Sequence, residues 1–182
     1  MQPLRIAVII GSTRQGRVGD GIGRWVAELA GQRAEVEVGL VDLGDYDFPP
    51  SYPDQPTEAM RRFVARIAWA DGFVVVTPEY NRSFPASLKQ AIDYAYDEWH
   101  AKPAGFVSYG YRSEGVYAVE QLRTVFTELH VMTMRNGVGV NLLDDDELDT
   151  ERRRQAATAM LDQLTWWATA LRDARRRQPY VS

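Results

Sequence analysis

Buried-strand runs that alternate with amphipathic segments restrict the fold of this sequence more than any other feature. Residues 4–10 (LRIAVII) are apolar and largely β-branched and end at a glycine, and apolar residues then recur every three or four positions over residues 20–30. The first pattern is typical of a strand buried on both faces, and the second of a helix with one buried face. The same alternation recurs along the chain, which predicts an α/β fold.

Five strands and five helices follow from these patterns. Strands are predicted over residues 4–10, 36–43, 73–77 and 104–109, and a fifth, interrupted strand over 131–134 and 138–140. Helices are predicted over residues 20–30, 57–70 with Thr57 as N-cap, 85–98, 116–129 and 148–176, the last after an acidic stretch at 144–147. Right-handed crossovers place these helices on both faces of a parallel sheet. Ligands of such sheets bind at the carboxyl ends of the strands, which makes the loops after Ile10, Val76 and Ser108 the candidates.

Composition excludes several classes of function. The 182 residues, 45% of them hydrophobic, suit one domain over residues 1–182, and a net charge of −4 provides no positive field for nucleic acid. The chain has no cysteine and two histidines in different segments, so neither a thiolate site nor a multi-histidine metal site is expected. Redox chemistry would therefore need an organic cofactor. Without a signal peptide or an apolar stretch of membrane-spanning length, a cytoplasmic protein with no membrane contact is expected.

The loop after the first strand, residues 11–20 (GSTRQGRVGD), has the composition of an anion site. Glycines free backbone N–H groups, hydroxyl and guanidinium groups add donors, and the following helix contributes its positive end. The expected ligands of the anion are Ser12, Thr13, Arg14, Arg17, Val18 and Gly19. An ordinary turn with exposed arginines is the alternative, but it does not account for the coincidence of position, glycine, hydroxyl and charge.

The spacing within this loop narrows the choice of anion. A nucleoside triphosphate loop would carry Lys followed by Ser or Thr where this chain has Arg17 and Val18. The glycines at 11, 16, 19, 21 and 23 do not form the Gly-x-Gly-x-x-Gly fingerprint of dinucleotide sites directly after the strand. A single terminal phosphate, such as that of FMN, fits best.

The segment after the third predicted strand carries a family resemblance. Together with GSTRxGRVG, the stretch TPEYN-x-x-x-P-x-x-LK-x-AID over residues 77–93 resembles the NADPH-dependent FMN reductase family, and the resemblance extends over roughly residues 5–134. It implies a flavodoxin-like three-layer sandwich with strand order 2-1-3-4-5, FMN as cofactor and NADPH or NADH as hydride donor. It further implies a small-molecule electron acceptor such as a quinone, an azo compound or free flavin, and a homodimer or homotetramer.

The resemblance also implies which residues lie beside the flavin ring. These are Pro78, Glu79, Tyr80 and Asn81 of the second loop, and Ser108, Tyr109 and Gly110 of the third. Backbone groups of residues 79–81 would meet the polar edge of the ring, with Tyr80 as an aromatic wall. Taken without the resemblance, Tyr80 and Phe84 would be core aromatics and Asn81 a turn residue. Two further groups have two interpretations each. A surface ion pair or a contact across a subunit interface is open for Lys89 and Asp93, and a place in the core or in that interface for the aromatic residues at 94, 96 and 99.

The third loop, residues 108–115 (SYGYRSEG), departs from the family pattern S-x-G-G-x-x-G-G. Tyr111 and Glu114 replace two glycines, and both are expected to restrict substrate access to the flavin. Besides a reductase, the sequence therefore leaves open a family member with lost or specialised activity. An FMN-binding electron carrier is a further alternative, although the two arginines of the first loop are unlike the hydroxyl-rich loops of such carriers.

Overall fold

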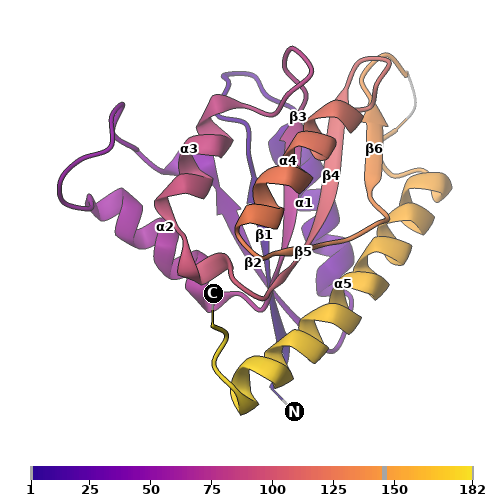
Figure 1. The fold of residues 1–182 in the computed structure, drawn as a ribbon. Coiled ribbons are helices and arrows are strands. Elements are labelled where there is room, and N and C mark those ends of the chain that lie inside the picture. The colour runs from indigo at the N-terminus through magenta and orange to yellow at the C-terminus, as the bar shows by residue number, and fades with distance from the viewer. Residues whose placement is uncertain (1, 145–146, 182) are drawn as a thin grey trace.

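The computed structural model describes residues 2–144 and 147–181 as a parallel sheet between two layers of helices (Figure 1). The strands are β1 (Leu4–Ile10), β2 (Val36–Asp42), β3 (Gly72–Pro78), β4 (Pro103–Gly110), β5 (Met132–Thr133) and β6 (Val138–Asn141). The helices are α1 (Gly19–Gly31), α2 (Glu58–Trp69), α3 (Ala86–Tyr94), α4 (Val116–Glu128) and α5 (Glu151–Arg177), with 3-10 turns η1 (Leu43–Asp45) and η2 (Asp97–Trp99). Asp145 and Asp146 of the predicted acidic stretch lie outside the described residues.

The sheet confirms the predicted strand order. Its strands run β2-β1-β3-β4-β5, all neighbouring pairs are parallel, and β6 also pairs with β4. The interrupted fifth strand is therefore two short strands along one edge, with Met132 opposite Pro103 and Val138 opposite Val107. This topology, with helices on both faces, is the flavodoxin-like arrangement that was expected.

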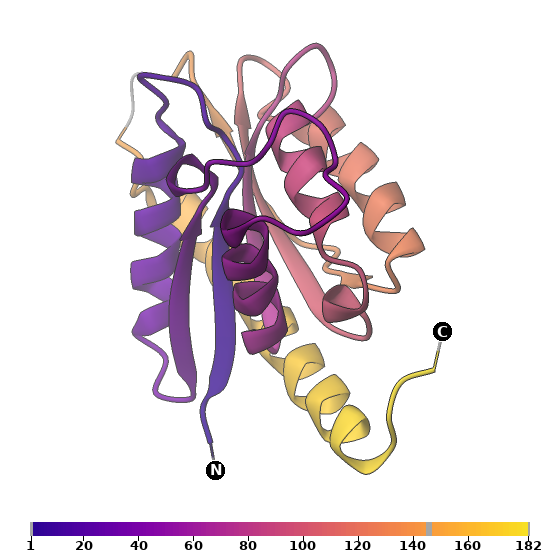
Figure 2. The same ribbon diagram turned by 90° about the vertical axis from the view of Figure 1, so that its left-hand side faces the viewer.

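The near-continuous apolar strands contribute side chains to two hydrophobic cores, one on each face of the sheet. Ala7 and Ile9 pack against α2, α3 and α4, whereas Ile6 and Val8 pack against α1 and α5. Successive side chains of a strand point to opposite faces, so a strand covered on both sides must be apolar throughout. Figure 2 shows the sheet between α1 at the left and the layer of α2, α3 and α4 at the right.

Two helices differ from their predicted bounds by more than one residue at an end. The third ends at Tyr94 rather than residue 98, because the chain turns inward there to bury Trp99, whose Nε1 donates to the Ile92 carbonyl at 3.1 Å. The last begins at Glu151 rather than residue 148, with the Thr150 side chain accepting from the Arg153 N–H as N-cap. The predicted cap Thr57 is confirmed, since its hydroxyl accepts from the Met60 N–H.

Among the described residues, no helix combines the length and apolarity that crossing a bilayer would demand.

Candidate functional site

Three loops meet above the carboxyl ends of β1, β3 and β4, at the upper edge of the sheet in Figure 1. They enclose a cavity of about 350 Å³. Its walls are formed by Ser12, Arg14, Gln15, Gly16, Arg17, Val18, Pro78, Glu79, Tyr80, Tyr109, Gly110, Tyr111 and Leu142. Of the residues predicted for the site, the lining lacks Thr13, Gly19, Asn81, Ser108 and Glu114. Gln15, Gly16 and Leu142 were not predicted. The loops chosen from the sequence thus converge on one place.

The first loop continues the sheet and then turns over the cavity. The Gly11 N–H donates to the Val76 carbonyl at 2.8 Å, which carries the β1 to β3 pairing one residue past the strand. Ser12 follows with 1% of its surface exposed, and its Oγ lies 3.3 Å from the Tyr80 hydroxyl. Gly16 has a φ of 69°, a left-handed conformation that glycine adopts at little cost. The turn leaves Arg14 exposed on the cavity wall without an ion pair among the described residues.

The start of α1 presents donors that lack acceptors. Val18 occupies the N-cap position and makes no side-chain cap, so the first N–H groups of the helix keep their hydrogen-bonding capacity. The Tyr109 hydroxyl is buried beside them with no hydrogen-bond partner among the described residues, and it packs where a Cβ on Gly19 would collide with it. Burial, partly offset by the nearby Ser12 hydroxyl, raises the pKa of Tyr109 to about 12, so the phenol keeps its proton near neutral pH and remains a donor. These groups fit a bound phosphate.

Arg17 has partners within the chain. Its Nη1 donates to the Ser12 carbonyl at 2.7 Å, and its Nη2 pairs with the Asp42 carboxylate at 2.5 Å. Asp42 is the last residue of β2 and also accepts from the Gly44 N–H at 2.9 Å. The guanidinium group therefore braces the first loop against the neighbouring strand while it lines the cavity. Sequence reasoning missed Asp42, although an acidic residue at the carboxyl end of a predicted strand was a usable signal.

The second loop is a tight turn. Tyr80 and Ser83 exchange backbone hydrogen bonds of 2.8 and 3.0 Å across Asn81 and Arg82, which both have positive φ. Two left-handed central residues are the mark of a type I′ turn, which asparagine tolerates well. The Glu79 N–H donates to the Tyr109 carbonyl at 3.0 Å. The backbone N–H groups of residues 79 and 80, two of the three that were expected to meet the flavin ring, are therefore already bonded within the chain.

The aromatic residues of the second loop separate into two environments. Tyr80 is 37% exposed and stands on the cavity wall, where a planar ligand can stack against it. Phe84 is half-buried against the core under α2, α3 and α4. The core interpretation therefore applies to Phe84 and not to Tyr80.

Glu79 ties the second loop to the third. Its carboxylate accepts from the Ser113 hydroxyl at 3.0 Å and from the Tyr117 N–H, in the first turn of α4, at 3.1 Å. Ser108 holds the same loop from below by donating to the Glu114 carbonyl at 2.7 Å. The path of the third loop thus depends on side chains from β4 and from the end of β3.

Tyr111 and Glu114 lie in different places. Tyr111 is 66% exposed on the lip of the 350 Å³ cavity. Glu114 lines a separate hollow of about 280 Å³ beside Arg135, and its Oε1 lies 3.7 Å from the Arg152 guanidinium. Of the two residues expected to restrict access, only Tyr111 therefore faces the candidate site directly.

A larger hollow of about 800 Å³ runs along α3 next to the second loop. Tyr52, 69% exposed, forms part of its wall, and the predicted pair is present there, with Lys89 Nζ 2.6 Å from an Asp93 carboxylate oxygen. Of the aromatic residues that follow, Trp99 is a core residue, whereas Tyr96 is 58% exposed. The α3 side of the site is therefore open and partly aromatic.

Comparison with known proteins agrees with this geometry. The sequence model of the family described as NADPH-dependent FMN reductase matches residues 4–142. An NAD(P)H-dependent FMN reductase of Schizosaccharomyces pombe is 40% identical over 117 residues, and the match spans 58% of each chain. The chain thus spans under two thirds of that relative's length. A quinone reductase of Pseudomonas putida is 31% identical over 183 residues, 91% of this chain and 95% of that enzyme.

Solved structures show the same fold. A flavoenzyme NAD(P)H:acceptor oxidoreductase of Paracoccus denitrificans superposes with a TM-score of 0.78 at 23% identity, covering 92% of this chain and 98% of the other. A flavodoxin of Pseudomonas aeruginosa superposes with a TM-score of 0.56 at 20% identity, covering 93% and 99%. Because the family match extends over most of its residues, this chain belongs to the NADPH-dependent FMN reductase family.

Proposed function

We propose that this chain is an FMN-dependent NAD(P)H oxidoreductase that reduces a small acceptor of the quinone class. The observation that carries the proposal is the buried, unpartnered Tyr109 hydroxyl beside the uncapped start of α1, in the cavity that Arg14 also lines. Family membership supports the cofactor, and the quinone reductases among the relatives support the acceptor class. When bound, FMN would supply the chemistry of hydride uptake and electron release.

The first loop holds the phosphate end of the cofactor. Arg14 provides the cationic side chain, while Tyr109 and the N–H groups at the start of α1 provide neutral donors. Arg17 and Asp42 keep the loop in position. Since arginine and the helix end balance the phosphate charge, binding requires no magnesium ion.

The second and third loops hold the ring end. Tyr80 and Tyr111 offer aromatic surface on two walls, and Pro78 ends β3 between them. The Glu79 carboxylate is engaged by Ser113 and Tyr117, so it orders the loops and is not free to act as a base. The protein thus binds and orients reactants and leaves the redox step to the cofactor.

We further infer that the chain forms a homodimer or homotetramer through the hollow along α3. Tyr52 and Tyr94 lie with ring centroids 5.4 Å apart at this hollow, and Tyr52 is exposed in the single chain. Exposed aromatic residues are enriched at protein interfaces. Sedimentation of the FMN-loaded protein at micromolar concentration checks this inference, and a monomer would contradict it.

Flavin titration tests the cofactor assignment. Purified chain, freed of flavin and kept in EDTA, is expected to quench FMN fluorescence with a stoichiometry of one and to bind FAD more weakly, because an enclosed phosphate leaves no exit for the adenylate. Equal affinity for both flavins, or a magnesium requirement, would contradict the proposed phosphate site.

A turnover assay separates the reductase from the alternatives. The loaded protein should oxidise NADPH or NADH faster when a quinone is added. Tight FMN binding without nicotinamide oxidation would favour the electron carrier or a specialised family member, for which the exposed Tyr111 on the cavity lip is the structural argument.

A further inference from the structure

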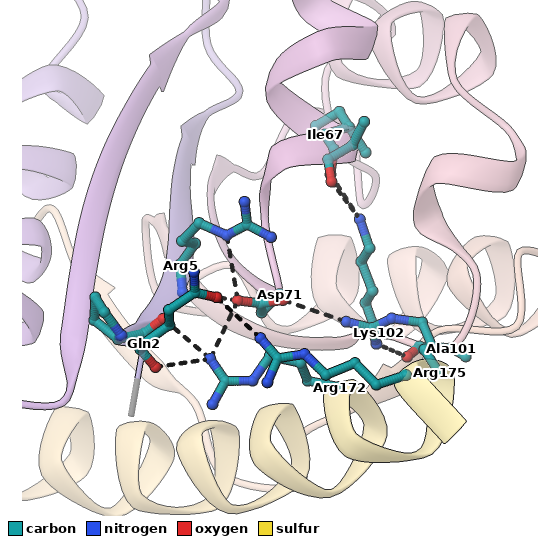
Figure 3. Close-up of polar contacts among 11 residues, drawn as sticks. Gln2, Arg5, Ile67, Asp71, Ala101, Lys102, Arg172 and Arg175 are labelled. Atoms are coloured by element: carbon teal, nitrogen blue, oxygen red, sulfur yellow. Dashed lines mark hydrogen bonds and ion pairs between the residues drawn. The ribbon is translucent and has the colours of Figure 1, made fainter. Parts of the chain in front are cut away.

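The amino-terminal end of the sheet, opposite the candidate site, contains a buried amine. Lys102 lies one residue before β4 and is 7% exposed, and its Nζ donates to the carbonyls of Ile67 at 2.8 Å and Ala68 at 3.3 Å. Figure 3 shows its side chain extending toward Ile67 at the end of α2. The chain has one other lysine, Lys89, which is exposed and paired with Asp93. The two lysines therefore differ sharply in environment.

The charges around Lys102 disfavour its ammonium form. Asp71, the nearest buried carboxylate, lies within 3.4, 3.7 and 3.5 Å of the guanidinium groups of Arg5, Arg172 and Arg175, which converge on it in Figure 3. Within the described part of the chain, no carboxylate forms an ion pair with the lysine itself. Burial, assisted by Arg175 and Arg5 and opposed by Asp71 and Glu98, lowers the pKa of Lys102 to about 7.

The hydrogen bonds of the amine match its neutral form. A neutral amine has two N–H groups, which the two carbonyl oxygens accept, and one lone pair that no donor among the described residues occupies. An ammonium group would have a third N–H, for which the described residues offer only the face of the Phe73 ring, with its centroid 5.6 Å from Nζ. A desolvated amine beside another cationic group is the usual form of a nucleophilic lysine.

The amine also borders a cavity. This space of about 410 Å³ is lined by Ala68, Asp97, Glu98, His100, Lys102, Arg175 and Tyr180. His100 is 7% exposed, and its buried Nε2 has no hydrogen-bond partner among the described residues. A carboxylate formed on Lys102 would therefore have Arg175 and His100 as neighbours on the cavity wall. Asp97 and Glu98 on the same wall oppose such an anion. Asp97, whose side chain is 86% exposed, acts through solvent and so only weakly, whereas half-buried Glu98 is the stronger opponent that Arg175 and His100 must offset.

We propose that Lys102 is a modification site at which the side-chain amine takes up carbon dioxide as a carbamate. The nitrogen lone pair forms a bond to the carbon, one C=O electron pair moves onto oxygen, and one proton leaves to solvent. No electron is exchanged and no co-reactant is needed. Carbon dioxide is small enough to reach a nearly enclosed amine. The negative charge of the carbamate would be stabilised by the arginines around Asp71, which outnumber that carboxylate. The proposal does not depend on flavin binding.

The modified state preserves the local hydrogen bonding. A carbamate nitrogen retains one N–H, which can stay on the Ala68 carbonyl. The Ile67 carbonyl has a second donor, the Ala70 N–H at 3.3 Å, so it keeps a partner. The opposing interpretation is that Lys102 is a permanently charged ammonium that caps the carboxyl end of α2.

Trapping with labelled carbon dioxide distinguishes the two interpretations. The whole protein is equilibrated with ¹³C-bicarbonate at pH 8, the carbamates are alkylated with triethyloxonium, and the label is mapped by peptide mass spectrometry. Label at Lys102 should exceed label at Lys89 by at least about tenfold, because a normal lysine is almost fully protonated at this pH. Label at Lys102 should also fall as the pH is lowered below 7.

Variants provide the controls. Lys102→Met should abolish the labelled peptide and the ¹³C carbamate signal in the NMR spectrum of the intact protein, whereas Lys89→Met should retain both. The wild-type comparison of the two lysines remains informative if Lys102→Met fails to fold. Absence of label at Lys102, or equal label at both lysines, would overturn the proposal and favour the ammonium cap.

Discussion

Arg14 and Arg17 carry the same charge in one loop but have different neighbours. Arg14 is exposed on the cavity wall, whereas Arg17 is bound by the Ser12 carbonyl and the Asp42 carboxylate. The sequence predicts both as phosphate ligands. The acidic residue near the end of the second predicted strand is a signal for a partner, but the sequence alone does not show which arginine it binds, because Arg17 and Asp42 come together only when β1 and β2 pair. Only Arg14 can be lost without disturbing contacts within the protein.

Replacing Arg14 by alanine should weaken FMN binding by ~1.5–3 kcal/mol, the scale of a hydrogen bond to a charged group, and leave the melting temperature of the flavin-free protein unchanged. Fluorescence titration and thermal unfolding measure the two effects. Arg24→Ala, at an exposed position on α1, is the matched control.

Arg17→Ala should instead lower both FMN affinity and the melting temperature of the flavin-free protein, since Asp42 would lose the partner of a largely buried ion pair. The opposite pattern, with affinity lost only in Arg17→Ala at constant melting temperature, would make Arg17 the main phosphate ligand.

At the scale of elements, apolar periodicity in the sequence predicts where strands and helices form, whereas contacts between elements decide where some of them end. The sequence predicts the strands, the helices and the Thr57 cap because each depends on its own apolar pattern or on its own side chain. The early end of α3 is not predictable in this way, since it follows from burial of Trp99 between Phe73 and Phe126, which belong to other elements. The three loops chosen from the sequence meet at one cavity because parallel strands bring their carboxyl ends together.

The third loop is the element in which the sequence is expected to depart from the family pattern. Tyr111→Gly should raise the rate of FMN reduction by NADPH, because the phenol stands on the lip of the cavity and its removal opens access. Stopped-flow measurement on the loaded protein gives the rate.

Glu114→Gly provides the comparison for this loop. Glu114 has a φ of 52° and lines the neighbouring hollow, so glycine relieves backbone strain there without opening the cavity. If Glu114→Gly alone accelerates reduction, the carboxylate acts on the site by charge rather than by blocking the cavity. If neither variant does, the access hypothesis is wrong.

Asp71 joins three elements at the other end of the sheet. It precedes β3, accepts from the Arg5 N–H of β1 at 3.1 Å, and pairs with Arg172 and Arg175 of α5. Asp71→Ala leaves these arginines without their shared anion and should destabilise the protein by ~3–5 kcal/mol in urea unfolding.

Flavin affinity measured on the folded fraction of Asp71→Ala should not change, because the carboxylate is remote from the cavity at the carboxyl ends of the strands. Asp173→Ala, at an exposed site on α5, should be nearly neutral. Equal stability of the two variants would show that the cluster does not hold α5 on the sheet.

At the scale of the whole molecule, the candidate flavin site and the buried titratable lysine lie at opposite ends of one sheet. The first loop, the aromatic walls of the cavity and Tyr109 lie at the carboxyl ends of the strands. The buried amine of Lys102 and the arginines around Asp71 lie at the amino ends. Changes in protonation at Lys102 should therefore affect global stability without altering the flavin site.

The free energy of unfolding should rise with pH between about 7 and 10.5, because burial lowers the pKa of Lys102 to about 7 in the folded protein from 10.5 when unfolded. Over this window the unfolded chain binds a proton that the folded chain does not, and the gain approaches ~1.4 kcal/mol per pH unit. Below pH 7 both states are protonated and the full cost of burying the charge remains. Urea unfolding in carbon-dioxide-free buffer at pH 7, 8 and 9 measures the slope.

The contribution of Lys102 to this slope appears as a difference between variants, in which the other titrating groups cancel. Lys102→Met removes the buried titration and should flatten the rise of stability with pH. Lys89→Met should keep the wild-type slope, since Lys89 is exposed in the folded protein. Parallel curves for wild type and Lys102→Met would mean that the folded protein keeps this lysine charged. The hydrogen bonds to Ile67 and Ala68 would then act as an ammonium cap of α2, and the amine would have no nucleophilic lone pair at neutral pH.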